Sequence, residues 1–342
     1  MSDIREQWRS LVRSYCLSFD RPSGDVCWAP ELETASRERL RAIQSEKLVV
    51  AYRYLWECSP FYRRKFEAAG LGPDSVRGIE DLGRIPLSYR EEWLEDQQAS
   101  PPWGTFSPLR QEDWLERGWM FFSTSGTTAA CPRVFRHTTF DRDIWTYLGA
   151  RGLYAMGVRP NRDIAINCFS YGTSVAFWGM HYSLNHMGVP IISGGGASTE
   201  RRVMFIANYR PTVLMCTPSY CLYLGRAMEQ AGLSPRESSI RLIIASGEPG
   251  AGVPATKRRV EELWGAEMHD HFGCTEVAMP PLGYTCTYQV TQTEGPVGTH
   301  IMEDVYIPEV LDPETMQPVP EGKPGVLAVS NLYSEAQPIL RY

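Results

Sequence analysis

The sequence has 342 residues, of which 43% are hydrophobic and 22% charged, and its formal net charge is -6. This length and composition fit one large globular domain or two ordinary ones. The acidic balance and the scattered basic residues argue against nucleic acid as the main partner. No apolar run approaches the roughly 18 residues that a membrane span needs, so we expect no transmembrane helix and no membrane partner.

The N-terminus and the cysteines indicate a cytoplasmic protein. Residues 1–6 are charged and lack the apolar core of a signal peptide. The nine cysteines are irregularly spaced, which is typical of reduced thiols that pack in a core.

Three regions follow one another along the chain. Residues 1–110 are expected to be mainly helical, because apolar residues recur at helical spacing between Ala35 and Ala69, and the run ends at Gly70. Residues 111–275 are expected to form an α/β unit. Residues 276–342 are rich in Thr, Val, Pro and Gly and predict a β-rich subdomain with more antiparallel pairing, with strands near 305–311 and 325–331.

In the middle region, short apolar runs alternate with helical segments. Strands are expected at 163–168, 189–193, 212–216, 240–245 and 267–272, and helices at 174–187, 199–208, 219–231 and 254–264. This order predicts an α/β fold with a mostly parallel sheet and helices on both faces. Ligands of such sheets bind beyond the carboxyl ends of the strands.

A hydroxyl-rich loop, Ser123, Thr124, Ser125, Gly126, Thr127 and Thr128, follows the apolar run 119–122, which we expect to be a buried strand. Gly permits close backbone approach, and successive N–H groups with hydroxyls form an anion-binding concavity. The sequence therefore predicts a polyphosphate site, although a polar surface turn would use the same residues. No Gly-Lys-Ser/Thr follows, so this is not a Walker loop, and an unrelated phosphate-loop hydrolase is disfavoured.

Further segments occur in a fixed order after this loop. They are Thr217–Tyr220, Ala245–Pro249, Asp270–Glu276, Pro308–Thr315 and the final Arg341-Tyr342. Together they resemble the adenylate-forming ligase superfamily, and most closely its phenylacetate–coenzyme A ligase branch, over residues 48–342. The resemblance implies the large N-terminal domain of such an enzyme, in which residues 111–275 would bind nucleotide and acid. It also implies attack of a carboxylate on the α-phosphate of ATP, giving an acyl-adenylate and pyrophosphate, before transfer to a thiol.

The resemblance implies roles for individual residues. Thr124 to Thr128 would hold the β- and γ-phosphates, with Thr128 catalytic and Ser123 beside them. Glu276 would be catalytic and would bind Mg²⁺, which prefers oxygen ligands. Phe272 would stack on adenine, where the family usually has Tyr. The rest of the nucleotide site would comprise Gly247, Glu248, Pro249, Gly273 and Thr275.

The acid would occupy an apolar slot lined by aromatic residues, which suits an aryl or arylacetic acid. The slot would be lined by Tyr171, Gly172, Phe177, Trp178, His181, Ala245, Ser246, Gly273, Ala278 and Met279. His181 lies one helical turn from Phe177 and could reach a ring substituent or simply pack in the core. Cys286 and His300 correspond to half of a zinc site in some relatives, and an ordinary thiol and a surface histidine are the alternative.

The sequence also departs from the family. The loop reads Thr-Thr-Ala129-Ala130-Cys131-Pro132 where the family has Thr-Thr-Gly-Lys-Pro, so its second half must differ. The chain ends at Tyr342, where relatives continue into a hinge and a small domain with the catalytic lysine. We therefore expect a ligase shortened by design, by proteolysis or in nature, with slow or absent adenylation.

The final acceptor stays open at this point. The full-length protein could use coenzyme A, a carrier protein or another acceptor, and it could form a homodimer. A non-catalytic module that binds acid and nucleotide is the second class of function, and the altered loop would suit it.

Overall fold

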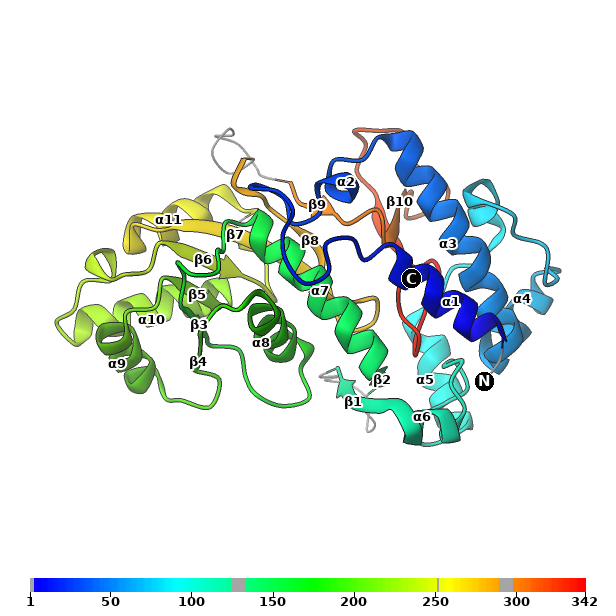
Figure 1. Ribbon diagram of the computed structural model, residues 1–342, viewed down its shortest axis with the longest axis horizontal. Helices are drawn as coiled ribbons and strands as arrows, with labels where there is room; N and C mark the ends of the chain where they lie inside the picture. Colours follow the sequence, from blue (N-terminus) through cyan, green and yellow to red (C-terminus); the bar gives the residue numbers. More distant parts are fainter. Residues whose placement is uncertain (1–2, 125–132, 251, 289–297) are drawn as a thin grey trace.

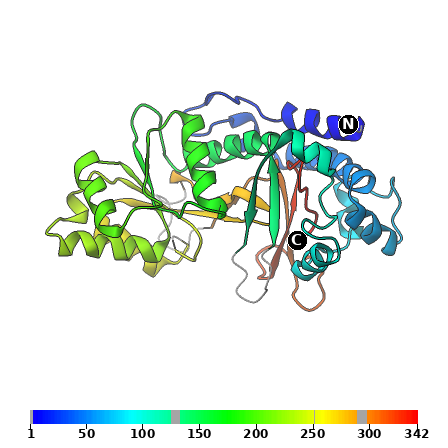
Figure 2. The ribbon, with the colours of Figure 1, turned by 90° about the horizontal axis from the view of Figure 1, so that it is seen from below.

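The structure is a computed structural model that describes residues 3–124, 133–250, 252–288 and 298–342; within one strand, the side chains of residues 278–280 are also outside this description. The molecule is elongated, with the helical N-terminal region at one end and the central sheet with its last helices at the other (Figures 1 and 2). Among the described residues, no helix has the length and apolar character to cross a membrane.

The largest sheet has the strand order β4-β3-β5-β6-β7-β8-β9. The pairs from β4 to β7 are parallel, and β8 and β9 continue the sheet in antiparallel pairing. Every residue of β3, β5 and β6 is buried, as expected for parallel strands covered on both faces. The strands are β3 Ala165–Asn167, β4 Ile191–Ser193, β5 Val213–Cys216, β6 Leu242–Ala245, β7 Glu267–Cys274, β8 Ala278–Tyr284 and β9 His300–Ile301.

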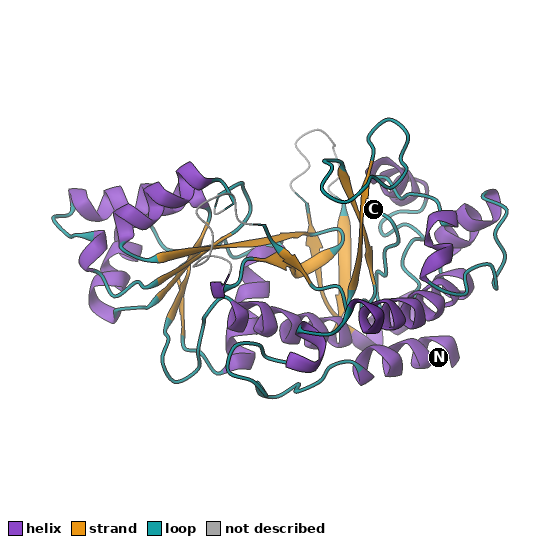
Figure 3. Ribbon diagram, turned by 90° about the horizontal axis from the view of Figure 1, so that it is seen from above, coloured by secondary structure: helices purple, strands orange, loops and turns teal. Residues whose placement is uncertain are grey.

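Helices cover both faces of this sheet (Figure 3). One core cluster joins the sheet to α9, α10 and α11 through residues such as Val203, Leu224 and Trp264. The other joins it to α7 and α8 through Leu148 and Phe177. The α/β fold class predicted from the sequence is therefore confirmed. These helices are α7 Thr139–Ala155, α8 Val175–Met187, α9 Thr199–Tyr209, α10 Pro218–Gln230 and α11 Pro254–Trp264.

The helical run expected from residue 35 to residue 69 is divided in two. Ser59 separates the helices because Pro60 disfavours helical geometry in the residue before it, and Ser59 has φ -106° and ψ 110°. Its side chain then caps the second helix by accepting from the Tyr62 N–H. The helices within residues 3–117 are α1 Asp3–Ser14, α2 Pro30–Glu33, α3 Arg37–Cys58, α4 Pro60–Ala68, α5 Arg90–Ala99 and α6 Gln111–Arg117, with a 3-10 helix at Ile79–Arg84. A second 3-10 helix lies further along the chain, at Pro235–Glu237.

Two smaller antiparallel sheets complete the fold. Strands were expected near 305–311 and 325–331, and both are present as β10 Tyr306–Leu311 and β11 Val326–Asn331, paired antiparallel. The strand expected over the run 119–122 is also present, as β1 Gly118–Ser123, paired with β2 Val134–Thr138. It is not a buried strand, however: only Phe122 is buried, and Phe121 is 48% exposed. A two-stranded sheet leaves one face of β1 without covering elements.

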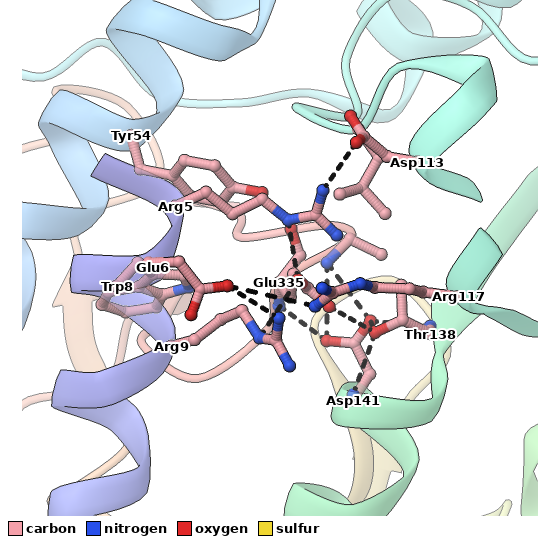
Figure 4. Close-up of polar contacts among 12 residues, drawn as sticks. Arg5, Glu6, Trp8, Arg9, Tyr54, Asp113, Arg117, Thr138, Asp141 and Glu335 are labelled. Carbon is pink, nitrogen blue, oxygen red and sulfur yellow. Dashed lines mark hydrogen bonds and ion pairs between the residues drawn. The ribbon is translucent and has the colours of Figure 1, made fainter. Parts of the chain in front are cut away.

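A buried polar network ties α1 to the C-terminal segment (Figure 4). Arg5 Nε donates to Glu335 Oε1 at 2.8 Å, and the Thr138 hydroxyl donates to Glu335 Oε2 at 2.7 Å. The Glu335 N–H in turn donates to Asp141 Oδ1 at 2.6 Å. The network thus joins both ends of the chain to the start of α7. The division into regions at residues 110 and 275 stays a prediction, and β8 and β9 continue the central sheet beyond residue 275.

Candidate active site

The candidate site lies where the parallel strands of the central sheet end. Cys216 on β5 pairs with Ala245 on β6, and Ala245 pairs with Asp270 on β7. The segments that follow these residues therefore begin at the same edge of the sheet. This is the edge at which open α/β sheets bind ligands.

The described flanks of the phosphate loop are held together by hydrogen bonds. The Ser123 hydroxyl donates to Thr173 Oγ1 at 2.9 Å, and the Ser123 N–H donates to the Thr173 carbonyl at 3.1 Å. The Thr124 N–H donates to the Arg133 carbonyl at 3.3 Å, which closes the base of the loop. Ser125, Gly126, Thr127 and Thr128 lie outside the described residues, so their phosphate-binding roles stay predictions.

Glu276 follows β7 and pairs with Arg133, which directly precedes β2. Arg133 Nη2 donates to Glu276 Oε1 at 2.5 Å, and the two side chains are 6% and 11% exposed, respectively. Burial raises the pKa of the neighbouring Tyr342, and the Glu276 charge adds to that shift. A nearly buried carboxylate beside the loop fits Mg²⁺, because this ion takes one or two protein carboxylates and fills its other positions with phosphate oxygens and water.

The expected adenine-binding residues are exposed at this edge. Gly247, Glu248 and Pro249 are all exposed, and Gly247 has φ +91°, which favours glycine. Glu248 Oε1 accepts from the N–H of Ser219 at 3.1 Å and also from its hydroxyl, and the hydroxyl bond is the main cause of the lowered pKa of Glu248. Phe272 is 42% exposed, so part of its ring is accessible to a ligand. Of the remaining nucleotide residues, Gly273 is exposed and Thr275 half-buried.

The structure brings five of the expected acid-site residues together at the start of α8. The Tyr171 ring lies 4.8 Å from Phe177 and 4.6 Å from Trp178, measured between ring centroids. Phe177 stacks on His181 at 5.5 Å, and Trp178 Nε1 donates to the Gly172 carbonyl at 2.7 Å. These contacts make one aromatic cluster.

The other expected acid-site residues lie elsewhere or are not described. Ala245 packs with Cys216 and Met268 in the core on the opposite face of the sheet from Phe177. Its side chain therefore does not join the aromatic cluster, because alternate residues of a strand face opposite sides. Ser246 is half-buried at the end of β6. Ala278 and Met279 lie on β8, and their side chains are outside the described part.

The sequence motifs did not reveal His271. This residue on β7 is buried, and neither ring nitrogen has a hydrogen-bond partner among the described residues. Burial lowers the pKa of His271 to about 4, so the ring is neutral at physiological pH. By strand alternation, His271 faces the same side of the sheet as the aromatic cluster, opposite Met268. A buried, unpaired imidazole is costly unless a ligand supplies its partner.

Cys286 and His300 do meet, with 3.3 Å between Sγ and Nε2. This hydrogen bond is the main cause of the raised pKa of His300. In the described part of the chain, however, no group of three or more His, Cys, Asp or Glu side chains is placed to hold a metal ion. The zinc site suggested by the resemblance is therefore not supported.

The fold and the arrangement of this edge define an adenylate-forming enzyme. A family profile described as AMP-binding enzyme matches residues 84–333. The chain belongs to this family.

Known relatives and solved structures agree with this placement. The phenylacetate–coenzyme A ligase of Thermus thermophilus is 38% identical over 317 residues, which cover 93% of this chain and 67% of the relative. The phenylacetate–coenzyme A ligase of Escherichia coli is 33% identical over 313 residues, or 91% of this chain and 67% of the relative. An open conformation of 2-hydroxyisobutyryl-CoA ligase, in complex with 2-HIB-AMP and CoA, superposes with a TM-score of 0.84 at 28% identity and covers 94% of this chain and 72% of that one. The chain thus spans about two thirds of the length of its curated relatives (66–67%).

Proposed function

We propose that this chain is the acid- and nucleotide-binding part of an AMP-forming acid–thiol ligase whose substrate is an aromatic carboxylic acid. The observation that carries the proposal is the meeting of Glu276, the base of the phosphate loop and an aromatic cluster at one edge of the sheet. The relatives named phenylacetate–coenzyme A ligases support an aryl or arylacetic acid as substrate.

In the first reaction, an oxygen of the acid attacks the α-phosphorus of ATP. A carboxyl–phosphate bond forms, the bond between the α- and β-phosphates breaks, and pyrophosphate leaves with its electron pair. Mg²⁺, when bound, would neutralise the phosphate charge that the reaction redistributes. The protein's own part is positioning: Glu276 would hold the Mg²⁺, the hydroxyls of the loop would orient the polyphosphate, and Phe272 offers a face for adenine.

The aromatic cluster would hold the acid and exclude water from its ring. Tyr171 is 64% exposed and Phe177 is buried, so the cluster runs from the surface into the core. Aromatic rings of this kind bind a flat apolar ring by contact area and by offset or edge-to-face stacking. Transfer to coenzyme A in the full-length protein is the expected second step, and a carrier-protein thiol is the other acceptor.

His271 favours an acid that carries a hydrogen-bonding group. Its two ring nitrogens have no hydrogen-bond partner among the described residues, and a hydroxyl or amino group of the substrate would supply one. The solved relative named 2-hydroxyisobutyryl-CoA ligase shows that this kind of fold also accommodates a hydroxylated aliphatic acid. The cytoplasmic location expected from the thiols stays a prediction.

Calorimetry on this chain tests the proposal. The panel comprises benzoate, phenylacetate, hydroxybenzoates, aminobenzoates and 2-hydroxyisobutyrate, each with and without Mg²⁺-ATP. Micromolar binding of one aromatic acid supports the proposal and identifies the substrate class, and selective binding of 2-hydroxyisobutyrate would replace the aromatic acid with an aliphatic one. Binding of neither acid nor ATP would refute an adenylating core, whereas ATP binding without any acid would favour another acyl class.

A further inference from the structure

Arg133 is the positive charge closest in sequence to the phosphate loop on its C-terminal side. The segment Ser123–Pro132 contains neither Lys nor Arg, and Arg133 follows it directly. The family pattern Thr-Thr-Gly-Lys-Pro places its cation before the proline, whereas this chain places its first cation after the proline. Compared with the family pattern, the first positive charge after the loop therefore lies on the other side of the proline, directly before β2.

Arg133 contacts residues that lie at the carboxyl edge of the central sheet. Besides Glu276 at 2.5 Å, its guanidinium lies 3.4 Å from the Thr124 hydroxyl oxygen and 3.4 Å from the Tyr342 hydroxyl oxygen. Tyr342 is itself fixed by stacking on Trp93, with 4.6 Å between centroids and 18° between planes. Arg133 therefore joins Thr124 of the loop, the expected magnesium ligand Glu276 and Tyr342.

The charges explain why this position matters. Glu276 and the ATP polyphosphate are both anionic, and a nearly buried carboxylate next to phosphate would repel it. The positive charge of Arg133 offsets the negative charge of Glu276. The Nε atom of Arg133 has no hydrogen-bond partner among the described residues. A guanidinium presents several fixed donors, so one group can serve a carboxylate and a phosphate together.

We propose that Arg133 is a positioning residue that holds Glu276 and faces the nucleotide phosphates, so that it sets how strongly ATP binding depends on Mg²⁺. The inference rests on the proposed function, because it requires that ATP binds at this edge. Arg133 offsets the negative charge of Glu276 when Mg²⁺ is absent, and the ion shares this role when it is bound.

The experiment measures the Kd of ATP by calorimetry in EDTA and in saturating Mg²⁺, and compares the ratio of the two values between variants. Arg133→Gln removes the charge and Arg133→Lys keeps it. Arg136→Gln is the matched control, because Arg136 lies nearby within β2 and is equally buried, but it contacts Gln111 and lies over the rings of Trp103 and Trp114. Thermal unfolding of each variant, followed by circular dichroism, establishes that it is folded.

Arg133→Gln is expected to weaken metal-free ATP binding about ten- to a hundredfold, the usual value of a hydrogen bond to a charged group. In saturating Mg²⁺ the loss should be less than about threefold, because the ion then compensates Glu276. The ratio should stay near the wild-type value in Arg133→Lys and Arg136→Gln.

Equal losses with and without Mg²⁺ would mean a merely structural role and would overturn the inference. The absence of metal-free ATP binding by the wild-type chain, with normal Mg²⁺-ATP binding, would overturn it too. Failure of the wild-type chain to bind ATP under either condition would instead refute the proposed function.

Discussion

Removing one partner of the buried pair between Arg5 and Glu335 should cost far more stability than removing one partner of an exposed pair of the same residue types. Arg5 Nε lies 2.8 Å from Glu335 Oε1, and the two side chains are 3% and 0% exposed, respectively. Arg5 Nη1 also lies 3.1 Å from Asp113. Arg5→Met keeps the length of the side chain but removes its charge, which leaves the Glu335 carboxylate buried without its main partner.

The structure sets the expected magnitude. Removing one partner of a buried ion pair costs about 3 to 5 kcal/mol. Arg9 Nε lies 3.4 Å from the same carboxylate oxygen and the Thr138 hydroxyl donates to the other, so part of the compensation survives. We therefore expect a loss near the lower end, about 3 kcal/mol in the free energy of unfolding.

Arg37→Met is the matched control. Arg37 pairs with Glu303 at 2.6 Å, but its side chain is 69% exposed, so its loss should cost less than about 1 kcal/mol. Urea unfolding followed by circular dichroism gives both values. Equal losses in the two variants would refute the reasoning.

Three further outcomes are expected. The free energy of unfolding should fall as the pH drops from 6.5 towards about 4, because unfolded His271 takes up a proton that the buried ring does not. In urea titrations of His271→Phe, the slope of this free energy against pH should be smaller by about 1.4 kcal/mol per pH unit. An unchanged slope would mean that His271 is protonated in the fold. Phe272→Ala should weaken Mg²⁺-ATP binding by about 1 kcal/mol in calorimetry, whereas Phe272→Tyr should leave it unchanged, since stacking needs only the ring. Equal ATP affinities in the two variants would place adenine elsewhere. Tyr171→Ala should weaken binding of the preferred aromatic acid about fivefold or more without changing ATP binding, and an unchanged acid affinity would exclude this ring from the acid site.

The α/β part of the fold could be predicted because its signals are local. Each expected strand and helix from residue 163 to residue 264 is present, with bounds that differ by a few residues, since apolar runs alternate there with helix caps such as Thr217 and Ser198. The helix α7 was not predicted. It is buried along most of its length, so it has no polar face to reveal a helical period.

Residues of the candidate site could be predicted only where they belong to a short sequence motif. Glu276, Phe272 and Gly247 were expected from short segments, and the structure places all three at the carboxyl edge of the sheet. The pairing of Glu276 with Arg133 joins positions 143 residues apart, which no local pattern reveals. A local pattern also cannot show that the two ring nitrogens of His271 have no hydrogen-bond partner in the described part of the chain, because this depends on how distant elements pack around them.

We propose that the carboxyl edge of the central sheet binds an activated acid. Calorimetry with the non-hydrolysable sulfamoyl analogue of the phenylacetyl-adenylate tests it most directly, because that molecule occupies the acid and nucleotide sites at once. We predict binding at least about a hundredfold tighter than that of phenylacetate or AMP alone, as expected for an analogue that joins two sites. An analogue that binds no more tightly than AMP would contradict an acid site beside the nucleotide site.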